Sequence, residues 1–332
     1  MLERLKRNLL LAIGLGVVVY FVLTLIAGFG DLRNALDGFR WEFIPVILGF
    51  VALSYVGRYF RWVYYLRVLG ISIPTGVNSA IFAAGLSMAI SPGKMGEVLK
   101  SLFVKQVSGD PVARTAPAVV AERATDATGM VLWGMLGVLA FNYGPGLLFL
   151  FLGMTVAGIA VLRSKRLSKL AERGMAKVPV LSKLAPHVGA FHSSSDTLLG
   201  VRPMVVGTVI SFLSWGLECV AVYLCVVGVG AELPFLEVVF IFAVSSLAGA
   251  LSFVPGGIGV AEAGLAGMFG ALAGLAGGLA VALTFLIRLA TLWFATLIGV
   301  FGLLLVRRLI GEPAETETPQ AEAGAAGGES AV

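Results

Sequence analysis

Long apolar stretches alternate with short charged segments along this chain. Stretches long enough to cross a bilayer lie at roughly 9–28, 42–66, 115–141, 145–162, 203–229 and 276–306. A helix of about 20 apolar residues crosses the hydrocarbon core of a membrane. The pattern therefore predicts an all-α integral membrane protein with about six transmembrane helices. The first stretch is too long for the apolar core of a signal peptide, so it is predicted as an uncleaved helix.

Two further apolar segments are interrupted in the middle. One runs from about residue 76 to 103 and breaks at Ser91-Pro92-Gly93, and the other runs from about 236 to 275 and breaks at Pro255-Gly256-Gly257. Each half is too short to span the hydrocarbon core. We therefore predict two re-entrant helical hairpins. Irregular backbone at that depth is tolerated only where protein or a water-filled cavity covers it.

Basic residues indicate which ends of the helices face the cytoplasm. They fall on one predicted side, at Arg4, Lys6, Arg7, Arg58, Arg61, Arg67, Lys100, Lys105, Arg114, the basic loop 163–202, and Arg307-Arg308. Glu232 and Glu237 precede the second broken segment, which must then open from the outside. Both termini are therefore predicted to be cytoplasmic.

This orientation divides the chain into two inverted repeats. Residues 1–162 form the first, 163–202 a basic cytoplasmic loop, and 203–310 the second, with one hairpin entering from each side. Inverted repeats with broken helices that meet near the midplane are a common transporter plan. The tail at 311–332 is rich in Ala, Gly and Glu, so it is predicted to be disordered, with no assigned function.

The two breaks carry the same short motif. The first copy is Pro92-Gly93-Lys94-Met95-Gly96 followed by Glu97, and the second is Pro255-Gly256-Gly257-Ile258-Gly259 followed by Glu262. Arg123 lies 26 residues after Glu97, and Arg288 lies 26 residues after Glu262. This repeated spacing makes a chance match of the motif a poor explanation.

Pro and Gly explain why a helix would stop and restart at these motifs. Pro lacks a backbone N–H and Gly tolerates positive φ, so the chain can turn there. The second half-helix then begins with free N–H groups and a positive dipole end, which attract phosphate or carboxylate. Lys94 adds a full positive charge in the first copy only. The simpler interpretation is that both motifs are tight turns.

Several charged residues fall within or beside the apolar segments. They are Glu97, Lys100, Glu122, Arg123, Asp126, Glu218, Glu262 and Arg288. A charge at the bilayer centre costs about 2.5–3.5 kcal/mol, so such side chains face one another or a cavity. They could form structural ion pairs, Glu97 with Arg123 and Glu262 with Arg288. Alternatively, they could line a polar cavity for an anionic head group or for proton coupling.

Composition supports the membrane class and excludes others. The 332 residues are 58% hydrophobic and 13% charged, whereas soluble domains carry about 25% charged residues. The excess of basic residues follows the ends of the spans, and no aromatic-rich basic segment indicates nucleic-acid binding. We found no clustered Cys and His ligands in the sequence and expect neither a metal nor a cofactor.

The combination of motifs resembles the lysylphosphatidylglycerol synthase transmembrane family over about residues 5–308. Family members that make this lipid use the membrane part as a flippase-like unit, and a separate soluble domain transfers the aminoacyl group. The chain ends at Val332, so we expect no such domain and do not carry over the synthase activity. The resemblance places the substrate site at Pro92, Gly93, Lys94, Gly96, Glu97, Lys100, Glu122, Arg123, Asp126, Pro255, Gly256, Gly257, Gly259, Glu262 and Arg288.

The leading hypothesis is a flippase-like lipid transporter of the cytoplasmic membrane. Lys94, Arg123 and Arg288 would bind a head-group phosphate, and nearby carboxylates would balance them. The substrate would be an anionic or aminoacylated phospholipid or a lipid-linked sugar. Whether the protein is a homo-oligomer, and whether a separate synthase supplies the lipid, stays open.

Two alternatives belong to other classes. A membrane-embedded lipid-modifying enzyme would need a nucleophile, a base or a metal, and we found no His near any motif, so we expect no enzyme. A non-transporting scaffold could pack through its many glycines. Charges within the apolar segments argue against a scaffold, since it has no need to bear their cost.

Overall fold

A computed structural model describes residues 2–90, 98–138 and 185–311, with a few isolated positions between 146 and 166. The side chains of residues 2–13 and 185–188 are not among those described. Several sequence predictions lie outside the described residues. They are the first motif (Pro92, Gly93, Lys94, Gly96 and Glu97), most of the predicted 145–162 span, much of the 163–202 loop, and the tail beyond Gly311.

Every element of the described chain is helical, which confirms the all-α class. The elements are α1 (Leu2–Ala27), α2 (Phe29–Asp37), η1 (Trp41–Phe43), α3 (Ile44–Val68), α4 (Thr75–Leu86), η2 (Ser87–Ile90), α5 (Leu99–Ser108), α6 (Val112–Val138), α9 (Ala185–Leu198), α10 (Val201–Gly228), α11 (Phe235–Leu251), η5 (Pro255–Gly257), α12 (Val260–Ala271), α13 (Gly277–Arg288), η6 (Leu289–Trp293) and α14 (Phe294–Ile310). Helix α9 lies within the stretch expected to be a basic loop.

Three helical stretches of the described chain are long and apolar enough to cross a membrane. They are Trp41–Val68, Val201–Gly228 and Gly277–Ile310, the last being α13, a π-helical turn and α14 in one run. Helices α1 and α2 form a further apolar pair that bends by 100°. The bend falls at Gly28, whose φ of 87° few other residues adopt. The described residues thus provide three spans, or four if the bent pair is one.

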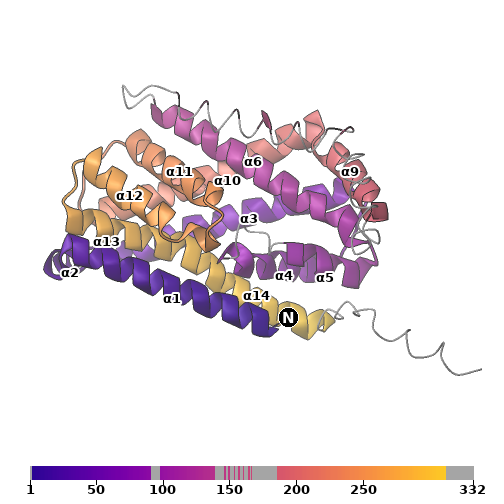
Figure 1. Cartoon of the computed structure of the whole chain (residues 1–332), viewed down its shortest axis with the longest axis horizontal. Coiled ribbons are helices and arrows are strands. Elements are labelled where there is room, and N and C mark those ends of the chain that lie inside the picture. Colours follow the sequence, from indigo (N-terminus) through magenta and orange to yellow (C-terminus); the bar gives the residue numbers. More distant parts are fainter. Residues whose placement is uncertain are drawn as a thin grey trace, which may run out of the picture.

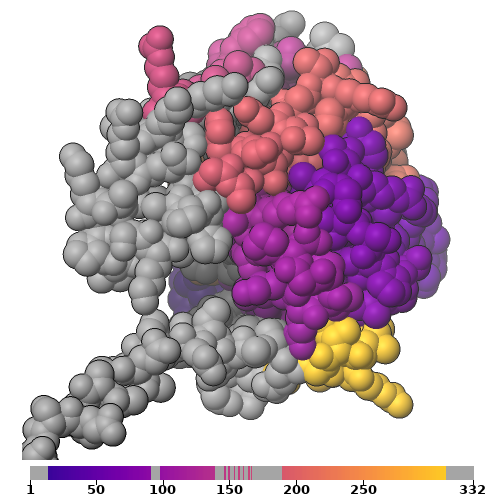
Figure 2. Space-filling model, turned by 90° about the vertical axis from the view of Figure 1, so that its right-hand side faces the viewer, coloured from indigo at the N-terminus to yellow at the C-terminus, as the bar shows by residue number. Residues whose placement is uncertain are grey.

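The long helices run along one axis of the molecule (Figure 1). Helix α10 packs against both α3 and α6, and α1 packs against α13. Two pairs of shorter helices, α4 with α5 and α11 with α12, lie towards opposite ends of the molecule (Figure 1). Figure 2 shows the end formed by α5, α9 and the last turn of α14. The first residues of α1 lie towards this end as well (Figure 1).

The same connection leads into both pairs of short helices. Helix α3 is followed by Gly70, whose φ is 72°. Ile71 N–H donates to Leu66 O, and α4 begins after Pro74. Helix α10 is followed in the same way by Gly230, whose φ is 77°. There Ala231 N–H donates to Val226 O, and α11 begins after Pro234. Glycine in a left-handed conformation followed by a proline is a strong helix stop.

The second Pro-Gly motif joins α11 and α12 into a helical hairpin. Gly256, Gly257 and Gly259 have φ of 63°, 64° and 94°. A Cβ atom on Gly257 would lie 3.0 Å from the Cα of Gly249 in α11, so the turn also needs a small residue there. The motif therefore makes a tight turn, as its composition predicts.

The two broken segments meet inside the molecule. Helices α4 and α5 pack against each other, and the short helix η2 at the end of α4 contacts η5 of the second hairpin. Ile90, Ile258 and Leu292 form a small buried apolar cluster at this meeting point. Residues of both short helices, Ala89 of η2 and Gly256 and Gly257 of η5, line the cavity described next.

Candidate functional site

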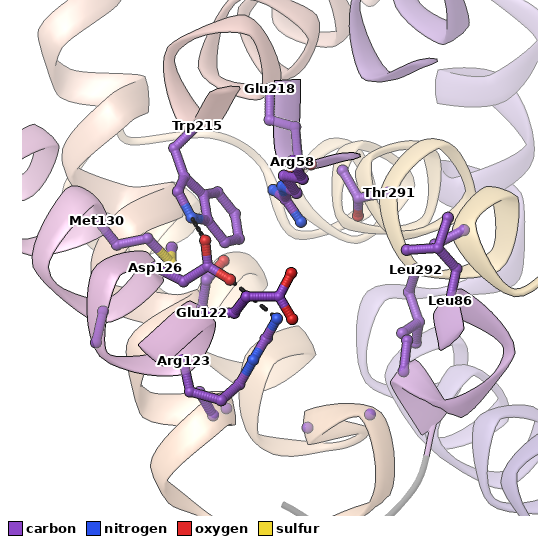
Figure 3. A pocket seen from close by; sticks show the side chains of 18 of the residues that line it. Arg58, Leu86, Glu122, Arg123, Asp126, Met130, Trp215, Glu218, Thr291 and Leu292 are labelled. Atoms are coloured by element: carbon purple, nitrogen blue, oxygen red, sulfur yellow. Dashed lines mark hydrogen bonds and ion pairs between the residues drawn. The ribbon is translucent and has the colours of Figure 1, made fainter. Parts of the chain in front are cut away.

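A cavity of about 480 Å³ lies among α3, α4, α6, α10, α11 and the α13–α14 run. Its charged lining comes from four different long helices and from α5. Among the described residues these charges are Arg58, Arg61, Lys100, Arg123, Arg288, Glu122, Asp126 and Glu218. Charged side chains from distant parts of the sequence therefore gather around one space in an apolar helical protein (Figure 3).

Asp126 of α6 is the centre of the largest group of contacts. Its Oδ1 accepts hydrogen bonds from Arg61 Nη1 at 2.5 Å, Ser211 Oγ at 2.7 Å and Trp215 Nε1 at 3.2 Å. Arg123 Nη2 lies 3.0 Å from the other oxygen, Oδ2 (Figure 3). One buried carboxylate thus contacts two guanidinium groups.

Arg58 and Glu218 form a second ion pair between α3 and α10. Arg58 Nη2 lies 2.6 Å from Glu218 Oε1, which also accepts a hydrogen bond of 2.9 Å from Ser54 Oγ. The Arg58 guanidinium lies over the ring of Trp215, 4.3 Å from its centroid. Stacking on an aromatic ring holds an arginine in place while its edge stays available for in-plane hydrogen bonds.

Lys100 and Glu122 form a third pair, and both residues are buried. The Lys100 Nζ also lies 4.3 Å from the centroid of the Trp62 ring. The aliphatic part of Lys100 crosses α4 at Gly85, where a Cβ atom would come within 2.7 Å of Lys100 Cδ. The glycine thus leaves the room that lets this lysine reach Glu122.

A fourth pair fastens the tip of the second hairpin. Arg288 Nε lies 2.6 Å from Glu262 Oε1, and Arg288 Nη2 donates to Gly256 O at 2.7 Å. The other Glu262 oxygen accepts a hydrogen bond of 2.7 Å from Gly259 N–H, at the start of α12. The expected pair between Glu262 and Arg288 is confirmed. The start of α12, predicted as a site for a substrate anion, is thus capped by the protein's own carboxylate.

Apolar side chains lie across the cavity from the group around Asp126. Leu86 of α4 and Leu292 of the π-helical turn lie across the space from Arg123, Asp126 and Trp215 (Figure 3). The cavity can therefore contact a charged group on one side and hydrocarbon on the other. This combination suits an amphipathic molecule.

The described part of the predicted site falls in or next to this cavity. Lys100, Glu122, Arg123, Asp126, Gly256, Gly257 and Arg288 line it. Pro255, Gly259 and Glu262 belong to the adjoining hairpin tip and its capped helix. The expected pair between Glu97 and Arg123 involves a residue outside the described ones.

Sequence reasoning missed two arginines of the site. Arg58 and Arg61 were interpreted as marks of the cytoplasmic end of a span, whereas the structure places both side chains in α3 against the cavity. Arg61 is fully buried and Arg58 nearly so, whereas Arg67 is exposed. The signal that could have found them is their spacing of three residues, which places both on one helix face.

Comparison with known proteins shows to which family this chain belongs. The sequence profile described as lysylphosphatidylglycerol synthase TM region matches residues 10–299. This chain belongs to that family. The resemblance inferred from the motifs is thereby confirmed, and so is the membrane class.

Similar proteins occur in archaea. A UPF0104 membrane protein of Methanothermobacter thermautotrophicus is 25% identical over 79% of this chain and 83% of its own length. A UPF0104 membrane protein of Pyrococcus horikoshii is 24% identical over 92% of this chain and 98% of its own length. These relatives are of matching length, and their names state only that they are membrane proteins.

Proposed function

We propose that this protein is a flippase-like transporter that moves a lipid head group between the leaflets of the cytoplasmic membrane. The observation that carries the proposal is the cavity itself. It places charged side chains from five helices around one space that is also lined by apolar side chains such as Leu86 and Leu292, in a protein whose helices can span a bilayer. Ionisable residues inside a membrane are costly and typically mark a substrate or ion pathway.

In this proposal the chain has about six transmembrane helices and two re-entrant hairpins, arranged as inverted repeats. The repeated Gly-to-Pro connection at 70–74 and 230–234 supports the repeat, since it leads into each short-helix pair in the same way. The contact between η2 and η5 supports hairpins that meet near the midplane. Discontinuous helices that meet there are where transporters bind their substrates.

The distribution of charge supports cytoplasmic termini. The helix ends and loops that meet near α9 carry six described basic residues and two acidic ones. The basic residues are Arg67, Lys105, Arg114, Arg202, Arg307 and Arg308, and the acidic ones are Asp110 and Asp196. The helix ends and loops that meet near α2 carry five described acidic residues and two basic ones. The acidic residues are Asp31, Asp37, Glu42, Glu232 and Glu237, and the basic ones are Arg33 and Arg40. The positive-inside rule then puts the first of these ends in the cytoplasm.

The lipid head group would enter the cavity while its acyl chains stay in the bilayer. Arg123 and Arg288, with Lys94 from the first motif, would contact the phosphate, and Arg58 joins them because its guanidinium lines the same space. Charge-assisted hydrogen bonds from arginine are well suited to phosphate oxygens. The proposal includes no chemical change of the lipid, so the protein is a transporter and not an enzyme.

Reconstitution into liposomes tests the proposal. Pure protein is incorporated into vesicles that contain a fluorescent phospholipid, and a membrane-impermeant quencher is added from outside. We expect the quenched fraction to exceed the share of label in the outer leaflet, and Arg123→Gln to abolish the excess. Arg67→Gln is the matched control, because Arg67 is exposed at the end of α3.

Two outcomes would contradict transport. If the folded protein gives no excess quenching with any lipid tested, no translocation occurs under conditions that should allow it. If the protein in detergent converts a lipid to a new product, the enzyme alternative replaces the transporter, because detergent removes the two leaflets.

A further inference from the structure

Helices α6 and α11 are tightly packed at one end and border the cavity at the other. At the close end, a Cβ atom on Gly137 of α6 would lie 2.8 Å from Leu236 O and 2.7 Å from Phe240 Cβ of α11. Further along the pair, Met130 of α6 and Leu247 of α11 line the cavity. The cavity therefore extends between these two helices.

This side of the cavity reaches the surface of the molecule. Of the lining residues in the described chain, Ala250 and Leu251 in the last turn of α11 are the two that are exposed. Val120, Ala124 and Ala127 line the same cavity from α6 and are half-buried. Their spacing of four and three residues places them on one face of the helix. These five residues therefore form an opening between α6 and the end of α11.

The opening is apolar, although it leads to charged groups. Its side chains are those of three alanines, a valine and a leucine, whereas Arg58 and Asp126 line the same cavity (Figure 3). In an integral membrane protein, an apolar opening suits contact with hydrocarbon and not with water. A molecule that lies across it therefore needs a polar group on one side and apolar chains on the other, as a membrane lipid has.

Phe253 lies directly after this opening in the chain and has a strained backbone. Its φ of 55° is the one positive value of a residue other than glycine in the described chain, and its side chain is 71% exposed. Val254 N–H donates to Ser252 Oγ at 3.2 Å, and that hydroxyl donates to Gly249 O at 2.7 Å. Backbone strain persists where the surrounding structure enforces it, and it is frequent at functional sites. An exposed aromatic ring is thus held beside the opening.

We propose that the opening is a lateral portal, where a glycerophospholipid lies with its head group in the cavity, its acyl chains in the bilayer and Phe253 against one chain. The inference rests on the transport function proposed above and names the place where the lipid enters. A head group that leaves water needs polar or charged partners, which the cavity supplies. Acyl chains need none, so they stay in the hydrocarbon and contact the apolar side chains of the portal.

Photo-cross-linking in detergent tests the inference without requiring transport. The pure protein is mixed with phosphatidylglycerol or phosphatidylcholine that carries a diazirine in one acyl chain, and the adducts are mapped by mass spectrometry. We expect adducts at 120–127 and 250–254 that saturate with lipid concentration and are displaced by unlabelled lipid. Val205, Val209 and Leu213 form an exposed face of α10 that does not line the cavity. Adducts there should increase without saturation.

Hexadecanol with the same diazirine is the control for the head group. It should label the portal no more strongly than the α10 face, because it has no head group to place in the cavity. Saturable adducts that form with both phospholipids at another surface, and not at the portal, overturn the inference. Saturable portal adducts from the alcohol, equal to those from the phospholipids, overturn it as well.

A bulky side chain in the portal should exclude the acyl chain. Ala250→Trp should raise the lipid concentration needed for half-saturation at least about ten-fold, the effect of losing roughly two buried methylene groups. Ala271→Trp is the matched control, because Ala271 is also exposed at a helix end of the second hairpin but does not line the cavity. Melting temperatures check that both variants fold. Equal half-saturation in the two folded variants contradicts the portal.

Phe253→Gly separates the role of the ring from stability. Glycine adopts a φ of this sign without strain, so the variant should melt at no lower a temperature than the wild type. Its saturable labelling should still be weaker, because the ring no longer contacts the acyl chain. Unchanged labelling in this variant would exclude Phe253 from the portal.

The two proposals can fail separately. A protein with saturable adducts at the portal that moves no lipid in vesicles would retain the lipid site and lose the transport function. A protein that moves lipid, but whose saturable adducts lie at another surface, would do the reverse.

Discussion

Arg61 illustrates how single residues hold the cavity together. Its side chain is 1% exposed, and Arg61 Nη1 contacts Asp126 Oδ1 at 2.5 Å. Removing one member of a buried ion pair costs about 3–5 kcal/mol because the other charge loses its partner. We expect Arg61→Gln to destabilise the protein by about 3 kcal/mol, at the lower end because Arg123 still contacts Asp126. Denaturation in mixed detergent micelles measures the change.

The control at this scale is Arg67→Gln in the same helix. Arg67 is exposed, so its loss should change the unfolding free energy by less than about 0.5 kcal/mol. The double variant Arg61→Gln with Asp126→Asn should recover only part of the loss, because it removes the carboxylate that lost Arg61 but also the ion-pair partner of Arg123. Equal stability of Arg61→Gln and Arg67→Gln would show that the buried pair contributes nothing.

A site residue could be predicted from the sequence where its charge falls inside an apolar stretch, because a charge within the bilayer is energetically costly. Glu122 and Asp126 lie in the middle of an apolar stretch, where a charge requires a reason. Arg58 and Arg61 lie close to the end of an apolar stretch, where arginine is also expected at a membrane interface. Only the structure shows that Arg61 is buried and Arg58 nearly so, with both side chains at the cavity.

At the scale of helices, glycines set how closely α14 approaches α4. A Cβ atom on Gly299 would lie 1.9 Å from the backbone N of Ser87 and one on Gly302 would lie 2.5 Å from that of Ala84. Overpacking of this kind typically costs about 1–3 kcal/mol. We expect Gly299→Ala to lower the unfolding free energy by at least this amount and to reduce transport, because α4 carries one wall of the cavity. Chemical denaturation and the liposome assay measure the two effects.

Gly49→Ala in α3 is the matched control for this contact. Gly49 is also within a long helix, but a Cβ atom there meets nothing within 4 Å. Alanine at such a site should stabilise the helix by up to about 1 kcal/mol. If both variants behave alike, the close approach of α14 to α4 has no energetic consequence.

Glu262 has two separable roles in the stability of the second hairpin tip. Glu262 contacts Arg288 through one oxygen and caps α12 through the other. Glu262→Gln keeps an oxygen that can accept the hydrogen bond from Gly259 N–H but loses the ion pair, whereas Glu262→Ala loses both. We expect stability to fall in the order wild type, Gln, Ala, with about 1 kcal/mol separating the two variants. Thermal unfolding of the three proteins measures the order, and equal loss in both would mean that the cap is unimportant.

One feature of the helices could not be predicted from the sequence. The run from α13 to α14 contains a π-helical turn at Leu289–Trp293, directly after Arg288. Such a turn leaves a backbone carbonyl without its usual partner, and here Tyr55 Oη donates to Thr291 O at 2.9 Å. Tyr55 is distant in sequence, so only tertiary packing reveals why the turn is stable.

For the molecule as a whole, hydropathy predicted the membrane class and the motifs indicated the family, but neither predicted how each apolar stretch is used. The predicted span at 115–141 corresponds to α6, whose 27 residues include Glu122, Arg123 and Asp126. The first predicted span continues into α2 through a 100° bend at Gly28. Helix α6 is thus not among the three described stretches apolar enough to span a membrane, and the first predicted span is bent. Both differences depend on which neighbouring helices cover the charged or bent segment, and a single sequence does not specify those contacts.

The orientation of the molecule can be tested with introduced cysteines, because its own two cysteines are buried. Cys219 and Cys225 are both free and buried, so they should not react with a membrane-impermeant maleimide in the native protein. Gly30→Cys in α2 and Ser193→Cys in α9 introduce exposed thiols at opposite ends. The position 30 site is open, since a Cβ atom there meets nothing within 4 Å.

If both termini are cytoplasmic, the two introduced thiols should show a specific pattern of labelling. In intact cells, the thiol at position 30 should react and the one at position 193 should not, because the basic end near α9 faces the cytoplasm. In inside-out vesicles the two should exchange behaviour, and the unsubstituted protein should stay unlabelled in both. If position 193 reacts in intact cells while position 30 is protected, the molecule is inserted the other way round. The second hairpin would then open from the cytoplasm, and the direction in which a head group enters the cavity would be reversed with it.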